Sequence, residues 1–360
     1  MSLNKKIFLF LMGLAMSNSI FSQDFTFSQF YEMPLLRNPA LAGNYKGSIR
    51  VLSAYRSQWA SVTVPFETKA LSTEMKFPVG NNSDFLSVGV QLIQDQAGDS
   101  KLSRTHIEPV INFHKSFDDA YSYLSFALIG GVVQSQFDPT RLTFDDQFVG
   151  GHFNSLNPTQ SVLTKTSLSY IDGGAGISFS SALDDGYFNY YFGAAGYHLL
   201  KPNVSFFDYN SIILKQRYVI NGGVSIPTGD NDNACFYGDY ILQGGSKQFL
   251  AGMLFSHLLY QDEIEDLNNK VSIHVGGAYR WADAFIPIVK LEMKKLFIGV
   301  SYDVNISKLR TASQYRGGFE VTASFKSFLN SQTYFGGSGG RNGGLSNGMS
   351  PNGMKCPTGF

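Results

Sequence analysis

The six histidines are the residues of this chain with the widest chemical use, as metal ligands and as general bases. They are His106, His114, His152, His198, His257 and His274. Their spacing matches no metal-binding motif such as H-E-x-x-H. His106 and His114 share one face of a strand-like stretch with Glu108 and Asn112, so we interpret them as a polar cluster bonded to neighbours and water. A hydrolase would instead need a serine or aspartate beside one of these rings.

Two further patterns have the composition of known sites. Gly336–Gly340 matches the G-x-S-x-G nucleophile motif, but it lies in a glycine-rich stretch, whereas that motif needs a strand, a strained turn and a helix. The oxygen-rich runs Asp230–Asn233 and Asp262–Asp266 could ligate calcium, yet neither has the EF-hand register. Solvated turns account for both. We therefore predict no catalytic, metal or cofactor-binding residues, and a protein that is not an enzyme.

The elements that position these residues are predicted to be β-strands. From Leu296 to Ser307 large apolar residues such as Ile298 alternate with small or polar ones such as Gly299 and Ser301. This two-residue period indicates a strand. Its apolar face continues for about ten residues, the length with which a tilted strand crosses a bilayer. Such a strand is typical of the wall of a membrane barrel.

The same alternation recurs between residues 47 and 326, where about 14 strand candidates (roughly 12–16) can be placed. Short, turn-rich connections alternate with others that include the two long ones, Gln134–Thr166 and His198–Ile213. We therefore predict an all-β fold, a transmembrane antiparallel up-and-down β-barrel, with the long connections outside the cell. Pro109 and Pro287 fall within strands and remove ladder donors, which predicts either bulges or shifted strand boundaries there.

The composition agrees with an exported membrane protein. Charged residues make up 16% of the chain against a typical value of about 25%, aromatic residues make up 14%, and the formal net charge is zero. A neutral chain offers no basic surface for nucleic acid. The first 22 residues, with Lys5, Lys6 and an apolar stretch from Ile7 to Met16, indicate a secretory signal peptide. No later stretch approaches the roughly 18 apolar residues of a membrane helix.

These observations divide the chain into four regions. Residues 1–22 are the predicted signal peptide, 23–47 a periplasmic or plug segment, 48–328 the barrel, and 329–360 a flexible glycine-rich tail. An even number of strands places both termini in the periplasm and the barrel in outer-membrane lipid. Cys235 and Cys356 are far apart and follow no metal-binding spacing. Two independent thiols are our favoured interpretation, and a single bridge between them is the alternative.

The segment from Phe27 to Gly43 is not explained by the barrel pattern. It reads F-S-Q-F-Y-E-M-P-L-L-R-N-P-A-L-A-G and is followed by Y-R-S-Q-W in the first predicted strand. Both sequences resemble the opening of the PorP/SprF family of outer-membrane proteins, associated with the type IX secretion system of Bacteroidota. The resemblance marks the following residues as the family motif and as a docking surface for a partner: Phe27, Ser28, Gln29, Phe30, Tyr31, Pro34, Asn38, Pro39, Ala40, Gly43, Tyr55, Arg56, Gln58 and Trp59.

The resemblance implies a function without catalysis. Family members assist secretion or surface attachment, some with the gliding and secretion machinery and others as partners of one large secreted protein, typically an adhesin. The expected partners are therefore components of type IX secretion, or a large adhesin-like protein. The alternative is a passive porin or small-solute transporter, favoured by the Gly, Ser and Asn residues on the polar faces of the strands. A segment that fills the lumen would count against this alternative.

Overall fold

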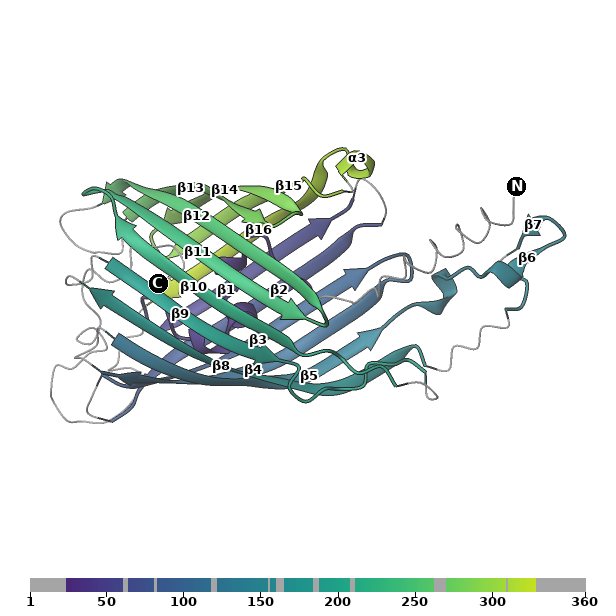
Figure 1. Ribbon diagram of the computed structural model, residues 1–360, viewed down its shortest axis with the longest axis horizontal. Coiled ribbons are helices and arrows are strands. Elements are labelled where there is room, and N and C mark those ends of the chain that lie inside the picture. Colours follow the sequence, from purple (N-terminus) through teal and green to yellow (C-terminus); the bar gives the residue numbers. More distant parts are fainter. Residues whose placement is uncertain are drawn as a thin grey trace, which may run out of the picture.

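The computed structural model describes residues 24–60, 64–80, 83–117, 122–154, 156–159, 165–183, 188–207, 211–261, 270–308 and 310–327. Fourteen antiparallel strands form a closed barrel, which confirms the predicted fold (Figure 1). They are β1 (Ile49–Gln58), β2 (Phe66–Pro78), β3 (Phe85–Ala97), β4 (Leu102–Ser116), β5 (Ser122–Gln136), β8 (Ser167–Leu183), β9 (Phe188–Tyr197), β10 (Arg217–Pro227), β11 (Asp232–Gln243), β12 (Ser246–Gln261), β13 (Lys270–Arg280), β14 (Ala284–Met293), β15 (Leu296–Asn305) and β16 (Arg316–Ser327). The predicted signal peptide and glycine-rich tail lie outside the described residues.

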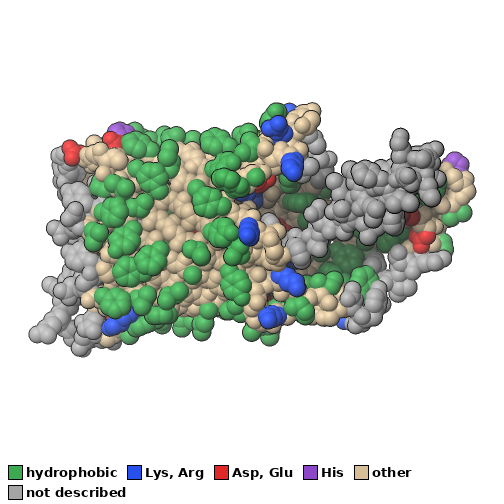
Figure 2. Space-filling model, viewed as in Figure 1, with side chains coloured by type: hydrophobic (Ala, Val, Ile, Leu, Met, Phe, Trp, Pro, Cys, Tyr) green, Lys and Arg blue, Asp and Glu red, His purple; other side chains and the backbone are tan. Residues whose placement is uncertain are grey.

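The alternation of the strands separates a lipid face from a lumen face. On β15, Ile298 and Val300 point outward and are 37% and 43% exposed, whereas Ser301 and Asp303 point inward and are buried. Apolar side chains are spread over the outer wall, and Lys and Arg side chains lie along one border of this surface (Figure 2). The polar faces therefore line the interior, and a sequence with this pattern is stable only when its apolar faces meet lipid.

The barrel has two different rims. β1 begins and β16 ends at the same rim, where Ile49 pairs with Ser327; we call this the terminal rim. The opposite rim, the loop rim, carries the long connections 137–166 and 198–216. The first of these contains the short elements η3 (Pro139–Arg141), η4 (Asp145–Gln147), β6 (Phe148–Val149) and β7 (His152–Phe153), and it projects beyond the barrel (Figure 1). A four-residue helix, α3 (Arg310–Ser313), lies in the connection between β15 and β16.

The two prolines lie inside strands, and neither a bulge nor a shifted boundary is needed to accommodate them. Pro109 pairs with Val90 of β3, while the pairing of β4 with β5 lapses between Ile107 and Val110. Pro287 pairs with Gly277 of β13, and the pairing of β14 with β15 lapses in the same way. Each proline thus lies at a two-residue gap in the hydrogen-bond ladder on one side of its strand, where no N–H donor is needed. Beyond the gap the register continues unchanged.

Short helical turns precede the barrel wall. They are η1 (Phe30–Glu32), α2 (Pro34–Arg37) and η2 (Pro39–Leu41). Proline occupies the first position of α2 and of η2, where its missing N–H would have no helical partner. In the described part of the chain, no helix is long and apolar enough to span a membrane.

Cys235 faces the lumen from β11, is fully buried and is disulfide-bonded. No described cysteine is free, so the interpretation of two independent thiols is wrong. The other cysteine of the chain, Cys356, lies outside the described residues.

We expect protease digestion without reductant to release a peptide that contains both Cys235 and Cys356, because the chain has no third cysteine. Mass spectrometry before and after reduction checks this. Alkylation of both thiols in the unreduced, denatured protein would contradict it.

Candidate functional site

The N-terminal segment, Asp24–Ser48, lies inside the barrel (Figure 1). Its residues hydrogen-bond to β2, β4, β8, β9, β10, β11, β14, β15 and β16, which together surround the lumen. Only a segment within the lumen can reach strands on all sides of a closed barrel. The sequence predicts a periplasmic or plug segment over residues 23–47, and in the structure the described part of it extends from the terminal rim to the level of the loop rim.

At the loop rim, Asp24 closes a buried charged cluster. His198, in the connection after β9, binds Asp24 through Nε2 at 2.7 Å and Asp172 of β8 through Nδ1. Both acceptors are carboxylates, so both ring nitrogens donate and the ring is an imidazolium. Burial by itself would lower the pKa of His198, but its hydrogen bonds to the two carboxylates raise the pKa to about 9. Burial opposes ionisation of Asp24 as well, yet His198 and Arg217 hold the pKa of that carboxyl well below its usual value.

Further into the lumen, charged side chains of the wall hold the backbone of the segment. Glu320 of β16 accepts the backbone N–H groups of Ser28 at 2.6 Å and Gln29 at 2.8 Å. Asp303 accepts the Ser28 hydroxyl and forms an ion pair with Arg56 of β1 at 2.6 Å. Hydrogen bonds from backbone N–H groups to buried carboxylates are strong, so this end of the motif is rigidly placed.

In the middle of the lumen, Arg37 forms a bidentate ion pair with Asp239 of β11. Nε lies 2.8 Å from Oδ2 and Nη2 lies 2.6 Å from Oδ1, with both side chains at most 5% exposed. The next residue, Asn38, donates its amide to the carbonyls of Ile177 and Ala194 on β8 and β9 at 3.0 and 3.3 Å. Its amide oxygen caps η2 by accepting the N–H of Ala40 at 2.9 Å.

Two glycines of the wall make room for Asn38. A Cβ atom at Gly176 would lie 2.0 Å from Asn38 Oδ1, and one at Gly193 would lie 2.6 Å from Asn38 Nδ2. Gly43 in the segment has a φ of +80°, and its Cβ would lie 1.8 Å from Ser87 Oγ. Only glycine permits both this backbone conformation and this approach.

Near the terminal rim, two side chains of the wall, Glu74 and Lys290, bind the segment. Glu74 of β2 accepts the N–H of Gly43 at 2.9 Å and pairs with Arg50 at 2.8 Å. Lys290 of β14 pairs with Glu32 of the segment. The segment is therefore connected to the wall by charge at its beginning, its middle and its end.

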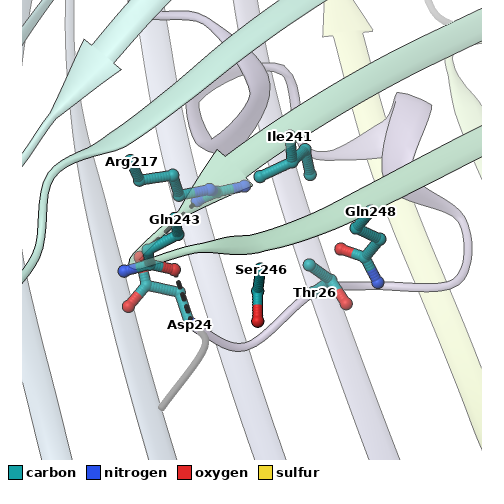
Figure 3. Close-up of a pocket in the computed structure, with 7 residues that line it drawn as sticks. All are labelled: Asp24, Thr26, Arg217, Ile241, Gln243, Ser246 and Gln248. Atoms are coloured by element: carbon teal, nitrogen blue, oxygen red, sulfur yellow. Dashed lines mark hydrogen bonds and ion pairs between the residues drawn. The ribbon is translucent and has the colours of Figure 1, made fainter. Parts of the chain in front are cut away.

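Apolar packing fills the space between these ionic contacts. Tyr31 stacks on Tyr237 of β11, with ring centroids 5.0 Å apart. Phe27 and Met33 form an apolar cluster with three residues of the wall, Ala54, Ala70 and Ile93. Small gaps remain between the described part of the segment and strands β10–β12, and two of these gaps are lined by residues of both. Asp24, Thr26, Arg217, Ile241, Gln243, Ser246 and Gln248 line the smaller one (Figure 3).

The motif residues divide into two groups. Those that meet in the lumen are Phe27, Ser28, Gln29, Phe30, Tyr31, Pro34, Asn38, Pro39, Ala40, Gly43 and Arg56. The remaining three do not join them. Tyr55 is 37% exposed on the outer face, where its hydroxyl contacts Glu67, and Gln58 and Trp59 lie where β1 ends at the loop rim.

Several charged wall residues that hold the segment were not singled out from the sequence. They are Glu74, Asp239, Lys290, Asp303 and Glu320. The sequence does contain one signal that could have found them, namely charged residues on the polar, lumen-facing side of the predicted strands. A buried charge there needs a partner of opposite sign. Arg37 and Glu32 in the motif are two such partners.

The histidine cluster predicted on β4 takes part in this packing. His114 and Asn112 bind the carbonyl of Ala42 at 2.8 and 2.7 Å. Ser256 lies 2.5 Å from His274, the nucleophile and base spacing of a hydrolase, but His274 has no exposed surface that a substrate could reach. Among the described residues, no group of three or more His, Cys, Asp or Glu side chains is arranged to hold a metal ion.

Residues 19–325 match a family described as type IX secretion system membrane protein PorP/SprF. This match covers the N-terminal segment and nearly the whole wall. The chain belongs to the PorP/SprF family. This PorP/SprF protein is thus an outer-membrane β-barrel associated with type IX secretion, and its family implies interaction with components of that system.

Several solved outer-membrane barrels are similar to this PorP/SprF protein in fold, at low sequence identity. The translocator domain of autotransporter NalP from Neisseria meningitidis is 9% identical, with a TM-score of 0.39 over 82% of this chain and 95% of that one. The toluene transporter TbuX from Ralstonia pickettii is 11% identical, with a TM-score of 0.45 over 82% and 93%. A TodX monoaromatic hydrocarbon channel mutant is 9% identical, with a TM-score of 0.43 over 83% and 94%. No curated protein matches the chain significantly.

Proposed function

We propose that this PorP/SprF protein is a non-enzymatic accessory barrel that assists the secretion or surface attachment of a large partner protein, such as an adhesin. The observation that carries the proposal is the N-terminal segment in the lumen. A barrel that moved small solutes by passive diffusion would need an open aqueous path. Here ion pairs and aromatic stacking occupy the lumen from Asp24 to Ser48, which favours a scaffold over the porin alternative.

The two rims suggest how such a scaffold is oriented. In outer-membrane barrels the longer connections face the cell exterior and both termini face the periplasm. The connections 137–166 and 198–216 would then meet a retained partner. The projecting part of the first carries exposed apolar side chains, with Phe148 and Val149 58% and 62% exposed. Apolar side chains that are exposed to water in the isolated protein often mark a surface that binds another protein.

Deletion of the gene should abolish surface display of one large exported protein while its transcript stays at the wild-type level. Surface proteolysis followed by mass spectrometry, with RNA quantification, measures both. Complementation with the intact gene should restore display, and so should a chain that carries the conservative outer-wall change Val300→Ile. Unchanged display of every large surface protein in the deletion strain would refute the proposal.

Gene order offers a second test of the adhesin role. A dedicated partner predicts a neighbouring gene for a very large, repetitive secreted protein, whereas a role in the general gliding and secretion machinery predicts that many exported proteins are lost together. The set of proteins missing from the surface of the deletion strain distinguishes these two roles.

A further inference from the structure

The loop-rim end of the N-terminal segment, Asp24–Phe25, is held differently from the rest. Asp24 is bound by His198 at 2.7 Å, and its backbone N–H donates to the side chain of Gln243 at 3.0 Å. Phe25 meets the edge of His106 at 5.5 Å. Both residues are half-buried, whereas Phe27 and the residues from Ser28 to Leu35 are buried. From Thr26 onward, the bonds from Arg56 and Glu320 fix the backbone.

His198 connects three parts of the molecule. It is the first residue of the 198–216 connection, it binds Asp172 on β8, and it binds Asp24 of the segment. Other described charged or titratable groups near this end are Arg217, 3.9 Å from Asp24, Tyr170 on β8, and Arg104, His106 and Glu108 on β4, with His106 in contact with Phe25. Of these groups, His198 alone contacts both the segment and the connection.

We propose that Asp24–Phe25 is a detachable end that His198 fastens to the loop rim, and that breaking this contact opens the cavity beside Asp24 while the rest of the segment stays in place. Asp24 forms one side of this small cavity, which Arg217 and Gln243 also line (Figure 3). Detachment also frees Arg217 from its ion pair with Asp24. A partner that moves the 198–216 connection would act on the same contact.

Alkaline pH provides a way to break the contact without a partner. The raised pKa of His198 means that the bridge is complete below the ordinary histidine pKa of 6.5 and is lost as the pH rises through about 9. The neutral ring keeps only one N–H, so one of the two carboxylates loses its hydrogen bond to His198, and Arg217, 3.9 Å away, is the cation left beside Asp24. The end should therefore be docked at neutral pH and detached above pH 9.

Thiol labelling of Thr26→Cys measures detachment, because Thr26 and Asp24 line the same cavity. The measured quantity is the rate at which this thiol reacts with a bulky maleimide. This rate is divided by the rate for a reference variant, Leu156→Cys, at a position where the native side chain is 88% exposed. The division removes the effect of pH on the thiol itself. The protein with neither substitution gives the background. At pH 7.5, adding His198→Asn should raise the normalised rate at least about tenfold, and asparagine tolerates the φ of +57° at this position. Without that change, the rate should rise to the same level above pH 9.

Two further variants make the test decisive. Asp24→Asn alters the segment and leaves the barrel wall intact, so it should also speed labelling at pH 7.5. His257→Asn removes a similar His–Asp contact of 2.7 Å that lies away from the segment, on the exposed outer face, and should change nothing. Slow labelling in both the His198→Asn and Asp24→Asn variants, or a step near pH 9 that persists without His198, would overturn the inference. The labelling does not depend on secretion, so failure of the proposed function would leave this result unaffected.

Discussion

Arg37→Ala should destabilise the folded barrel by about 3–5 kcal/mol, because it leaves the Asp239 carboxylate buried in the lumen without its partner. Both side chains are at most 5% exposed, so solvent cannot replace the lost guanidinium. The midpoint of guanidinium-induced unfolding in detergent micelles, followed by fluorescence of the two tryptophans, measures the change.

Two comparisons separate the buried ion pair from a general effect of losing arginine. Arg141→Ala removes an exposed ion pair with Asp138, whose atoms are 3.1 Å apart, and should leave the midpoint unchanged. The double variant Arg37→Met with Asp239→Leu replaces the pair by apolar side chains and should recover most of the loss. An Arg37→Ala protein as stable as the parent would show that the segment does not contribute to the stability of the barrel.

Gly176→Ala should displace the segment directly. The added methyl should cost about 1–3 kcal/mol or more in the free energy of packing the segment against β8. The added methyl would lie 2.0 Å from Asn38 Oδ1, and Asn38 cannot move without losing its bonds to Ile177 and Ala194. We expect the segment to become sensitive to added protease while the barrel wall stays resistant, because the three atoms nearest to the added methyl all belong to Asn38 and Pro39 of the segment and none belongs to the wall. Limited proteolysis and N-terminal sequencing measure this.

Gly238→Ala is the matched control for this substitution. Its added methyl would have its nearest neighbour, the carbonyl of Leu250, 3.9 Å away. This variant should resist protease like the parent protein. Equal resistance of the Gly176→Ala variant would mean that Asn38 is not held as tightly as its hydrogen bonds indicate.

The wall of the barrel could be predicted from the sequence because its periodicity is local. Alternation over ten residues, as from Leu296 to Ser307, reports directly which side chains face lipid. The number of strands and the positions of the long connections follow from repeating that pattern. Even Pro109 and Pro287 caused no error in strand placement, since a lapse of two residues in one ladder leaves the period intact.

The path of the N-terminal segment could not be predicted in the same way. Its contacts join residues more than 200 positions apart, as in Arg37 with Asp239 and Ser28 with Glu320, and no local period encodes such pairs. The motif identified the residues of the segment but not their partners. His198 illustrates the limit, because it follows a strand and has no sequence feature that separates it from five other histidines.

The enclosed segment also imposes an order on assembly. Asp24–Ser48 leads directly into β1, and β1 closes the barrel by pairing with β16, the last of the described strands. If the cylinder closed first, the segment would have to thread into the lumen with its bulky rings, such as Tyr31, which stacks on Tyr237. We expect the open sheet to curl around the segment instead, so that the residues before the first strand are enclosed at the moment when β16 pairs with β1.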